Sequence, residues 1–509
     1  MSISNFQLWL ANVAKARVND AAENIMSFKF NKKRLRLLSG ENEFNNCCPK
    51  DGSIVYCMTR SFRVEDNWGL LLAQKLSFKF NLPLTVIASL RMAQHQTTQR
   101  HFQFHLNGLK TLEGKLHELD IDFRIIYDGN NFDFDPKNES KETIKAIREV
   151  NAQVVVIDFC PLRHDKRLVN LMRSSLKDTI PICQVDSANV LPCWIISEKL
   201  EYSARTLRSK VHKVLNDYLT DFPPVVKSLV NPKTLTVNDF DKIQSEFNGI
   251  LDDKVEAVAW AKSGYEEGMK TLHYFIEKNL HVFNDYRNIP TKSTLSNLSP
   301  WFRFGQISTQ RCILEVVKVK NQHKVGSEIF VEEALVRREL TDNFCNYQED
   351  YDKVTGAWDW AKKTLMDHEK DKKELTYTKE QMENAKTGDD LWNSAQTQMK
   401  RDGKMHGFLR MYWAKKILEW FPGTTQETLD FALYLNDHYS LDGACPNGFV
   451  GEYFSQESIM WSICGVHDQG WKERPIFGKI RYMNYAGCKR KFNIDEFVAK
   501  YSNHKKLKF

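Results

Sequence analysis

Short apolar runs alternate with longer amphipathic segments through the first 205 residues of the chain. The apolar runs are rich in β-branched and aromatic residues and lie at 53–58, 84–88, 123–127, 154–158 and 182–186. A run that is apolar at every position is typical of a strand buried on both faces, and strands that alternate with helices usually form a parallel sheet. The pattern therefore predicts an α/β domain at residues 51–205, built as a doubly wound parallel sheet.

Beyond this region the strand signal stops. Residues 206–236 contain prolines at 223, 224 and 232 and are predicted to be a linker between domains. Helical periodicity dominates residues 237–492, which are predicted to form an all-α domain. Its expected helices cover 240–251, 255–278, 329–344, 357–367, 379–385, 389–399, 407–420 and 425–437.

The two ends of the chain differ from both domains. Residues 1–50 are polar and irregular, with a basic cluster at 31–36, so a poorly ordered extension is predicted. From Gly465 to Phe509, eleven lysines and arginines stand against four acids and alternate with aromatic residues. This composition fits a surface that follows a phosphate backbone and stacks on bases, or else a solvated basic segment. Residues 493–509 are predicted to be a basic tail.

The composition of the whole chain narrows its class. A length of 509 residues is too great for one core, and 42% hydrophobic with 27% charged residues describes a globular protein. Because no apolar stretch reaches about 18 residues and no secretory signal is present, we expect an intracellular protein that does not cross a membrane. The eleven cysteines form no Cys-x-x-Cys pair, so neither a disulfide framework nor a metal site is predicted.

Phosphate-binding signals are weak when the residues are taken alone. The predicted sheet is Rossmann-like, but no Gly-x-Gly-x-x-Gly follows its first strand. A turn of small residues at 295–300 precedes a predicted helix, and its hydroxyls together with the helix amino terminus could hold a pyrophosphate. A serine-rich turn is also an ordinary helix cap, so both interpretations stay open.

The predicted helix at 407–420 carries the most distinctive residues of the chain. At about 100° per residue, Trp413 and Trp420 face nearly the same way and lie roughly 10 Å apart along the helix axis. Arg410 stands on the same helix. Tryptophans at this spacing usually pack in a core, and they can also relay electrons because indole is easily oxidised.

Two long segments closely resemble a known family. Residues 330–344 and 465–484 match the two signature segments of class II cyclobutane pyrimidine dimer DNA photolyases, and the resemblance extends from Ser53 to about Phe492. It implies an antenna-type α/β domain followed by a helical domain that holds flavin adenine dinucleotide (FAD), active as reduced FADH⁻. The implied activity is light-driven: an electron passes from FADH⁻ to a dimer flipped out of UV-damaged double-stranded DNA, the dimer splits, and the electron returns.

The resemblance also implies which residues contact the cofactor. These are Tyr286, Ser296, Asn297, Leu298, Ser299, Arg410, Asn436 and Asp442. The pair Arg410 and Asp442 is expected to lie against the flavin ring, where a fixed cation favours the reduced anion, and Asn436 is expected near N5 of the ring. Without the family, the pair would be a structural ion pair and Asn436 a helix cap.

Substrate and electron-transfer residues follow from the same resemblance. Glu333 is expected to hydrogen-bond the dimer carbonyl, and Met411 and Trp461 to line the dimer pocket. From the residues alone, Glu333 could equally be an ion-pair partner of the neighbouring arginines. The tryptophans expected to reduce an oxidised flavin under light are Trp392, Trp413 and Trp420, with Tyr377 as an accessory.

The chain departs from the family pattern in three places. Cys445 replaces an aspartate, and an insertion stands between Gly451 and Trp461. If the insertion loops outward, Trp461 keeps its place in the pocket; otherwise dimer recognition changes. Residues 184–189 lack the histidine common in the antenna domain, so the identity of a second chromophore, of deazaflavin or folate type, stays open.

Two other functions are not excluded by the sequence. One is a cryptochrome or a (6-4) photolyase-like flavoprotein. The other is a catalytically silent protein that binds damaged DNA, which the insertion before Trp461 would favour. In each case we expect a monomer in the nucleus or cytoplasm, or in a viral factory.

Overall fold

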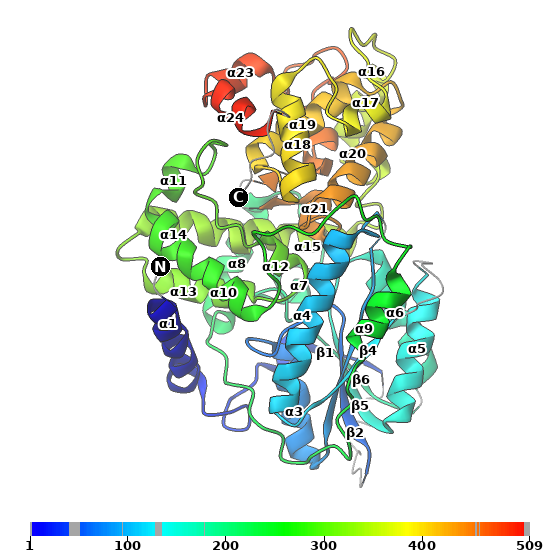
Figure 1. Ribbon diagram of the computed structural model, residues 1–509, viewed down its shortest axis with the longest axis vertical. Helices are drawn as coiled ribbons and strands as arrows, with labels where there is room; N and C mark the ends of the chain where they lie inside the picture. Colours follow the sequence, from blue (N-terminus) through cyan, green and yellow to red (C-terminus); the bar gives the residue numbers. More distant parts are fainter. Residues whose placement is uncertain are drawn as a thin grey trace.

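The structure is a computed structural model that describes residues 3–39, 51–93, 95–127, 135–177, 179–453, 456–457 and 459–502. An α/β domain occupies the lower right of Figure 1, and helices fill the upper and left parts. The predicted fold class, an α/β domain followed by a helical domain, is confirmed.

A six-stranded sheet forms the centre of the α/β domain. Its strands are β1 (Leu35–Ser39), β2 (Ser53–Met58), β3 (Leu84–Ser89), β4 (Asp122–Ile126), β5 (Ala152–Asp158) and β6 (Ile182–Val185), in the order β1-β6-β5-β2-β3-β4. All five predicted strands are present and pair in parallel, whereas β1 pairs antiparallel to β6 at the edge. Every residue of β2 is buried, as expected for a central strand of such a sheet.

Helices cover both faces of this sheet. Helices α3 (Trp68–Phe80) and α4 (Gln99–Glu118) share one core with the side chains of Tyr56 and Val156. On the other face, α5 (Pro136–Glu149) and α6 (Arg163–Leu176) pack against Val55 and Ile157. Successive side chains of each strand therefore enter opposite cores, which is the doubly wound arrangement that the apolar runs predicted.

The amino-terminal segment is ordered, so the prediction of a poorly ordered extension is wrong. Residues 3–39 contain α1 (Ile3–Ala16), the π-helical turn η1 (Arg17–Ala21) and strand β1. Phe6 and Val13 lie seven positions apart, hence on one face of α1, and both are buried against the helical domain. Two apolar side chains are enough to hold a helix against a domain that is already folded. The polar composition of this segment therefore gave a wrong prediction of disorder. Residues 40–50 of the predicted extension lie outside the described residues.

Three further boundaries differ from the sequence prediction. Helix α8 (Ala204–Tyr218) occupies the first part of the predicted linker, because Leu207 and Val211 are buried in the helical core. Helix α9 (Phe240–Phe247) packs with the sheet domain, so the helical domain begins after it. The predicted basic tail contains α24 (Ile494–Tyr501), which packs against α18 (Asp390–Asp402) and leaves its one basic residue, Lys500, exposed. Residues 503–509 of that tail lie outside the described part.

The helical domain follows the predicted periodicity closely. Its main helices are α10 (Tyr265–Tyr274), α13 (Thr309–Lys318), α14 (Lys324–Val331), α15 (Arg338–Tyr347), α16 (Asp359–His368), α17 (Lys379–Glu383), α18 (Asp390–Asp402), α19 (Gly407–Trp420) and α20 (Thr425–Tyr439). The helix predicted at 255–278 begins only at Tyr265, because Gly264 adopts a φ of 108° before it. A two-stranded hairpin, β7 (Glu452–Tyr453) with β8 (Gln456–Glu457), adds the one pairing of strands described in this domain.

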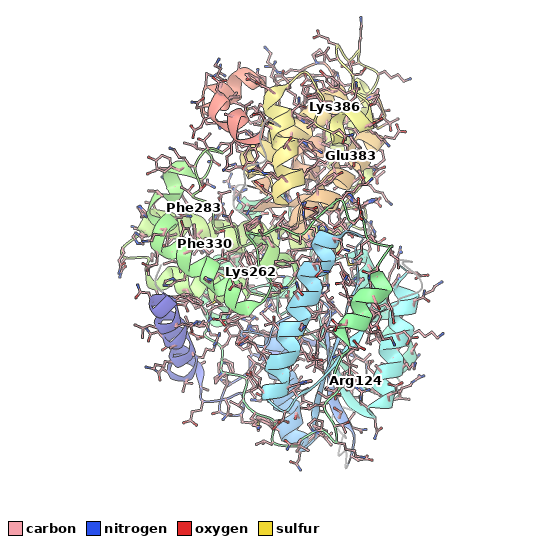
Figure 2. All side chains as sticks on the ribbon, viewed as in Figure 1. Arg124, Lys262, Phe283, Phe330, Glu383 and Lys386 are labelled. Carbon is pink, nitrogen blue, oxygen red and sulfur yellow. The ribbon has the colours of Figure 1, made fainter. Side chains whose placement is uncertain are left out.

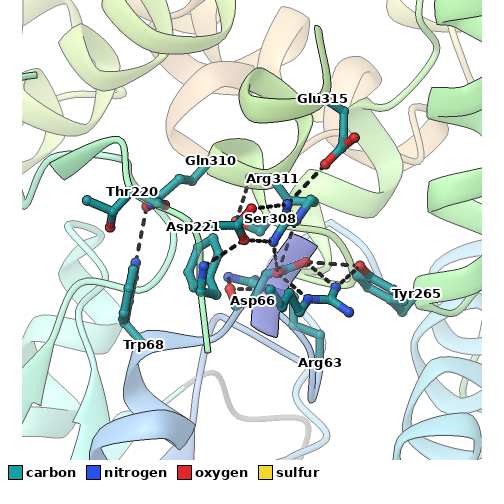
Figure 3. A network of polar contacts seen from close by, with 12 residues as sticks. Arg63, Asp66, Trp68, Thr220, Asp221, Tyr265, Ser308, Gln310, Arg311 and Glu315 are labelled. Carbon is teal, nitrogen blue, oxygen red and sulfur yellow. Dashed lines mark hydrogen bonds and ion pairs between the residues drawn. The ribbon is translucent and has the colours of Figure 1, made fainter. Parts of the chain in front are cut away.

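A buried network of charges joins the amino-terminal segment to both domains (Figure 3). Asp66, next to α3, accepts hydrogen bonds from Arg17 at 2.9 and 3.0 Å and from Arg311 of α13 at 2.9 and 3.1 Å. Arg311 also pairs with Asp221, and the Tyr265 hydroxyl donates to Asp66. Although burial acts to raise it, the pKa of Asp66 is held far below its ordinary value by the two guanidinium groups. The network thus ties together five segments that are distant in the sequence.

Replacing Arg17 with Met is expected to lower the free energy of unfolding by about 3 kcal/mol, because Asp66 and the Tyr265 hydroxyl would lose a buried partner. Denaturant unfolding of the full chain measures the change. Lys15→Met, an exposed change on the preceding helix, is the control and should lie within about 0.5 kcal/mol of wild type. Equal unfolding midpoints for the two variants would show that the network contributes little.

Candidate functional site

The turn at 295–300 is held in an unusual backbone conformation. Asn297 has a φ of 57°, in the left-handed region, and α12 (Ser299–Arg303) begins directly after it. Lys404, which precedes α19, donates a hydrogen bond from Nζ to Asn297 Oδ1 at 2.9 Å. Leu298 is fully buried, and the buried Ser296 Oγ has no hydrogen-bond partner within the described residues. The turn is therefore held in place and still has a hydroxyl, that of Ser296, which can form a hydrogen bond with a ligand.

Arg410 and Asp442 form a buried ion pair next to this turn. Arg410 lies on α19, Asp442 follows α20, and their closest atoms are 3.3 Å apart. Both side chains are at most 3% exposed. Burial acts to raise the pKa of Asp442, yet Arg410, Lys404 and the Ser299 hydroxyl keep it below its ordinary value. Arg410 therefore faces an ionised carboxylate, while its Nε has no partner in the described part of the chain.

Asn436 stands at the last turn of α20 with one side of its amide occupied. Its Nδ2 donates to Asp437 Oδ1 at 2.8 Å, which fixes the orientation of the amide. Asn436 Oδ1 is buried and, among the described residues, unpartnered. Burial raises the pKa of Asp437 to about 6, against a hydrogen bond from the Ala444 amide and the charges of nearby arginines. The side chain of Asn436 thus has an acceptor oxygen that is left without a partner in the described part of the chain, while one N–H of its amide is engaged.

Glu333 lies in a π-helical turn, η5 (Glu332–Arg337), between α14 and α15. Arg287 donates to its Oε1, while the buried Oε2 has no partner in the described structure. Burial raises the pKa of Glu333 to about 7, although Arg287 and Arg337 act in the opposite direction. At neutral pH this side chain is therefore divided between its ionised and its protonated, donor-bearing forms.

Arg287 is positioned by a short helix with a buried anchor. Helix α11 (Phe283–Tyr286) ends just before it, and the fully buried Phe283 packs at 5.2 Å from the ring of Phe275. Phe330 of α14 contacts the same Phe275 ring, so α11 and α14 share a core; both anchors are labelled in Figure 2. Tyr286 itself is 39% exposed, at the rim of the site.

Met411 and Trp461 are both buried, one on α19 and the other on a helix packed against it. Met411 follows Arg410 on α19, and Trp461 lies in α22 (Ile459–Cys464), which packs against α19. The ring of Trp461 has Lys415 Nζ at 5.0 Å and the Arg481 guanidinium at 5.2 Å. Trp461 is only 4% exposed, so the insertion before it has not displaced it into solvent.

The described backbone of the insertion, residues 452–453 and 456–457, packs against the helical domain. The backbone of β7 lies beside η5 and α15, and that of β8 lies against α19. The hairpin therefore stands between the helix that carries Arg410 and the turn that carries Glu333. Of the two arrangements that the sequence left open, the outward loop is wrong, although Trp461 stays in the core.

The three predicted electron-transfer tryptophans are in contact. Trp392 of α18 stacks on Trp413 with ring centroids 6.3 Å apart and an angle of 9°, and it meets Trp420 edge-on at 6.0 Å. Trp392 Nε1 also donates to the Trp413 carbonyl at 3.0 Å. The half-buried Tyr377 contacts Trp420 at 5.4 Å. The row runs Trp413, Trp392, Trp420, Tyr377, so the ring from α18 fills the gap between the two rings of α19.

A cavity of about 910 Å³ opens between the two domains. On one side it is lined by residues at the carboxyl ends of the strands and on α4, including Arg60, Arg91 and His105. On the other it reaches Arg303, Arg410 and Asp442 of the helical domain. Asp158 holds the lining loop in place by accepting hydrogen bonds from three successive amides, those of residues 59–61.

Sequence reasoning missed three residues that support this site. Lys404 contacts the turn, Arg287 pairs with Glu333, and Gln396 accepts a hydrogen bond from Trp413 Nε1 at 2.8 Å. Arg287 directly follows the predicted Tyr286, yet its partner is 46 positions away, and no local pattern reveals that pairing. Within the described residues, no three His, Cys, Asp or Glu side chains are grouped to hold a metal ion, and no helix is long and apolar enough to cross a bilayer.

Comparison with known proteins shows which family has this architecture. Residues 54–227 match the family described as DNA photolyase. A solved structure of a class III photolyase from Agrobacterium tumefaciens has a TM-score of 0.66 to this chain, with 16% identity, over 89% of this chain and 87% of that one. The fold is therefore that of the photolyases, with the tryptophan row and the buried ion pair in its helical domain.

Two relatives make the assignment more specific. A deoxyribodipyrimidine photo-lyase from Potorous tridactylus is 46% identical over 488 residues, which are 94% of this chain and 86% of that protein. The protein of the same name from Arabidopsis thaliana is 44% identical over 460 residues, 88% of each chain. The chain belongs to the deoxyribodipyrimidine photo-lyase family, which confirms the resemblance seen in the sequence.

Proposed function

We propose that this protein is a light-driven lyase that repairs cyclobutane pyrimidine dimers in UV-damaged double-stranded DNA. The observation that carries the proposal is the buried Arg410–Asp442 pair, with unused polar atoms around it, beside a row of touching tryptophans. A packed core alone needs no unpaired polar atoms, because each costs about 1–3 kcal/mol. The site is therefore built to receive a polar ligand and to pass electrons to it.

The cofactor that fits this site is FAD. The buried atoms without a partner in the described structure include Ser296 Oγ, Arg410 Nε and Asn436 Oδ1, a set that suits phosphates and a flavin ring. We assign the phosphates to Ser296, Asn297, Leu298 and Ser299, the ring to Arg410, Asn436 and Asp442, and the rim to Tyr286. When bound and reduced to FADH⁻, the flavin would supply the electron that light transfers to the dimer.

Arg410 and Asn436 would tune the cofactor in different ways. The Arg410 guanidinium places a fixed positive charge beside the ring and so favours the reduced anion. Asn436 has a buried oxygen without a partner in the described structure, while one N–H of its amide is engaged by Asp437, so the oxygen can accept a hydrogen bond from a protonated ring nitrogen. Asp442 keeps the buried site close to neutral and orients Arg410.

Glu333 would act on the dimer, with Met411 and Trp461 as walls of its pocket. In its protonated form, Glu333 can donate from Oε2 to a pyrimidine carbonyl while Arg287 holds the other oxygen. A donor placed where negative charge develops stabilises the extra electron on the substrate. A dimer can reach this pocket only after rotating out of the duplex.

The duplex itself would follow the basic segment near the carboxyl terminus. Trp471 is 44% exposed, and Arg481 lies over its ring at 4.2 Å while pairing with Asp468. Exposed aromatic rings among basic side chains bind nucleic acid by stacking and by contacts with phosphates. Affinity for damaged DNA should fall steeply as salt rises.

The cavity between the domains would hold a second, light-collecting chromophore of deazaflavin or folate type. The cavity has a volume of about 910 Å³, and its sheet side, at Arg60, Arg91 and His105, is the part proposed for this molecule, because the opposite side reaches the ion pair that is assigned to the flavin. The inward hairpin before Trp461 is the observation that keeps a silent damaged-DNA binder as the second candidate function. A monomeric state and an intracellular location stay predictions.

A repair assay separates the two candidates. Purified protein is incubated with a duplex that contains one thymine dimer, under blue light or in darkness, and restored DNA is quantified. We expect restoration only in the light, from protein that carries flavin. Retention of damaged duplex with no restoration in the light by fully reduced protein would identify the silent binder.

A further inference from the structure

Lys404 is a half-buried cation with spare hydrogen-bonding capacity. It stands between α18 and α19 and donates from Nζ to Asn297 Oδ1. An ammonium group has three donors, and this contact, with a neutral amide oxygen, uses one of them. Among the described residues, no carboxylate forms an ion pair with Nζ. Removing even part of an ammonium group from water costs free energy, and an anion bound beside it offsets that cost.

The surroundings hold Lys404 in place without neutralising it. Its Nζ lies 5.7 Å from the centroid of the Trp260 ring, which supports a cation on its face. The Leu441 amide donates to the Gly403 carbonyl at 2.8 Å, so the loop of Lys404 is fixed to the loop of Asp442. Asp442 attracts the ammonium group, whereas Arg410 repels it, and His406 is buried nearby. These are the charged and titratable groups that face it.

A second observation points to an anion at the same place. Ser296, one position before the contacted Asn297, is 2% exposed, and its hydroxyl has no partner within the described residues. Asn297, between this serine and α12, has a left-handed backbone conformation. A hydroxyl without a partner in the described structure and an ammonium group on the same turn match a phosphate, because a phosphate accepts several donors at once.

We propose that Lys404 is a further cofactor-binding residue, whose ammonium group neutralises a phosphate of the dinucleotide held by the turn at 295–300. The inference rests on the proposed function, since it takes the ligand to be FAD. Lys404 would then have two roles, holding the turn through Asn297 and balancing the charge that the ligand brings.

Titration gives this proposal a specific signature. Burial, with Arg410 adding to it and Asp442 opposing it, lowers the pKa of Lys404 in the free protein to about 8. A bound phosphate raises that pKa, so the ligand gains the full attraction below about pH 8 and loses it as the pH rises further. An arginine at 404 would stay charged throughout this range.

The test measures release of FAD from the full-length holoprotein after dilution, by the fluorescence of free FAD, between pH 6.5 and 9.5. For wild type we expect a dissociation constant that is flat to about pH 8 and then rises several-fold. Lys404→Arg should bind as wild type at pH 7 and show no rise. Lys404→Met should bind about 10- to 100-fold more weakly at pH 7, with no rise.

Lys386→Met is the matched control, because Lys386 is an exposed lysine, labelled in Figure 2. Its dissociation constant for FAD should equal that of wild type at every pH. If Lys404→Met does not fold, the proposal is still tested by comparing the rise of the dissociation constant with pH in wild type and in Lys404→Arg. The same rise in both, or wild-type affinity in Lys404→Met, would overturn the proposal. Wild-type protein that binds no FAD at any pH would instead refute the proposed function.

Discussion

Trp392→Phe is expected to lose the light-driven reduction of bound, oxidised flavin. Its rate of flavin bleaching under blue light should fall to that of a sample kept without an external reductant. The reason is its position: Trp392 lies between Trp413 at 6.3 Å and Trp420 at 6.0 Å, and it bridges them. Phenylalanine keeps most of the buried volume but is far harder to oxidise, so the relay is interrupted while the core stays filled. The measurement is the bleaching of oxidised flavin absorbance under blue light with an external reductant.

The same variant should still repair dimers once its flavin has been reduced chemically, because the row serves reduction and not the splitting step. Trp413→Phe should behave in the same way. Trp194→Phe, a tryptophan of the α/β domain outside the row, is the control and should photoreduce normally. Normal photoreduction in Trp392→Phe, or loss of repair in well-folded reduced protein, would contradict the assigned role.

Glu333→Leu is expected to lower the rate of dimer splitting by about 10²-fold, the usual effect of removing one donor from a site where negative charge develops. Glu333→Gln keeps a donor of similar shape, so it should retain a rate within about tenfold of wild type. The yield of repaired dimer per flash on chemically reduced protein measures both. Equal losses in the two variants would indicate that Glu333 serves packing or charge balance rather than donation.

The pH dependence of this step follows from the same group. Burial raises the pKa of Glu333 to about 7, and the protonated form is the donor. The donor fraction is therefore high below about pH 7 and falls as the pH rises through it, so the wild-type rate should decline toward alkaline pH. Glu333→Gln cannot titrate and should be flat over the same range. A decline of equal size in Glu333→Gln would assign it to another group.

The sequence predicted most of the sheet and of the catalytic helices because their apolar periodicity is strong. All residues of β2 are buried, and α19, predicted at 407–420, has those bounds in the structure. The errors lie where few apolar side chains decide the outcome: Phe6 and Val13 order α1, and Leu207 with Val211 makes the first part of the predicted linker helical. Single buried residues on polar helices leave little signal in composition.

The candidate site was predictable residue by residue only through the family resemblance. Helical spacing placed Trp413 and Trp420 on one face, but nothing local showed that Trp392 of another helix would stand between them. Contacts such as Arg287 with Glu333 and Lys404 with Asn297 join segments 46 and 107 positions apart. The direction of the insertion before Trp461 likewise depends on packing against α19 and η5, which the sequence does not encode locally.

An action spectrum of repair tests light-driven catalysis by this protein most directly. Reduced protein is mixed with dimer-containing duplex and illuminated at a series of wavelengths, and repair per incident photon is compared with the absorption spectrum of the same sample. We predict that repair follows the absorption of reduced flavin, with an added band if the interdomain cavity holds a second chromophore, and that darkness gives no repair. Repair that is independent of light, or bound dimers that stay intact at every wavelength absorbed by the flavin, would contradict the proposed function.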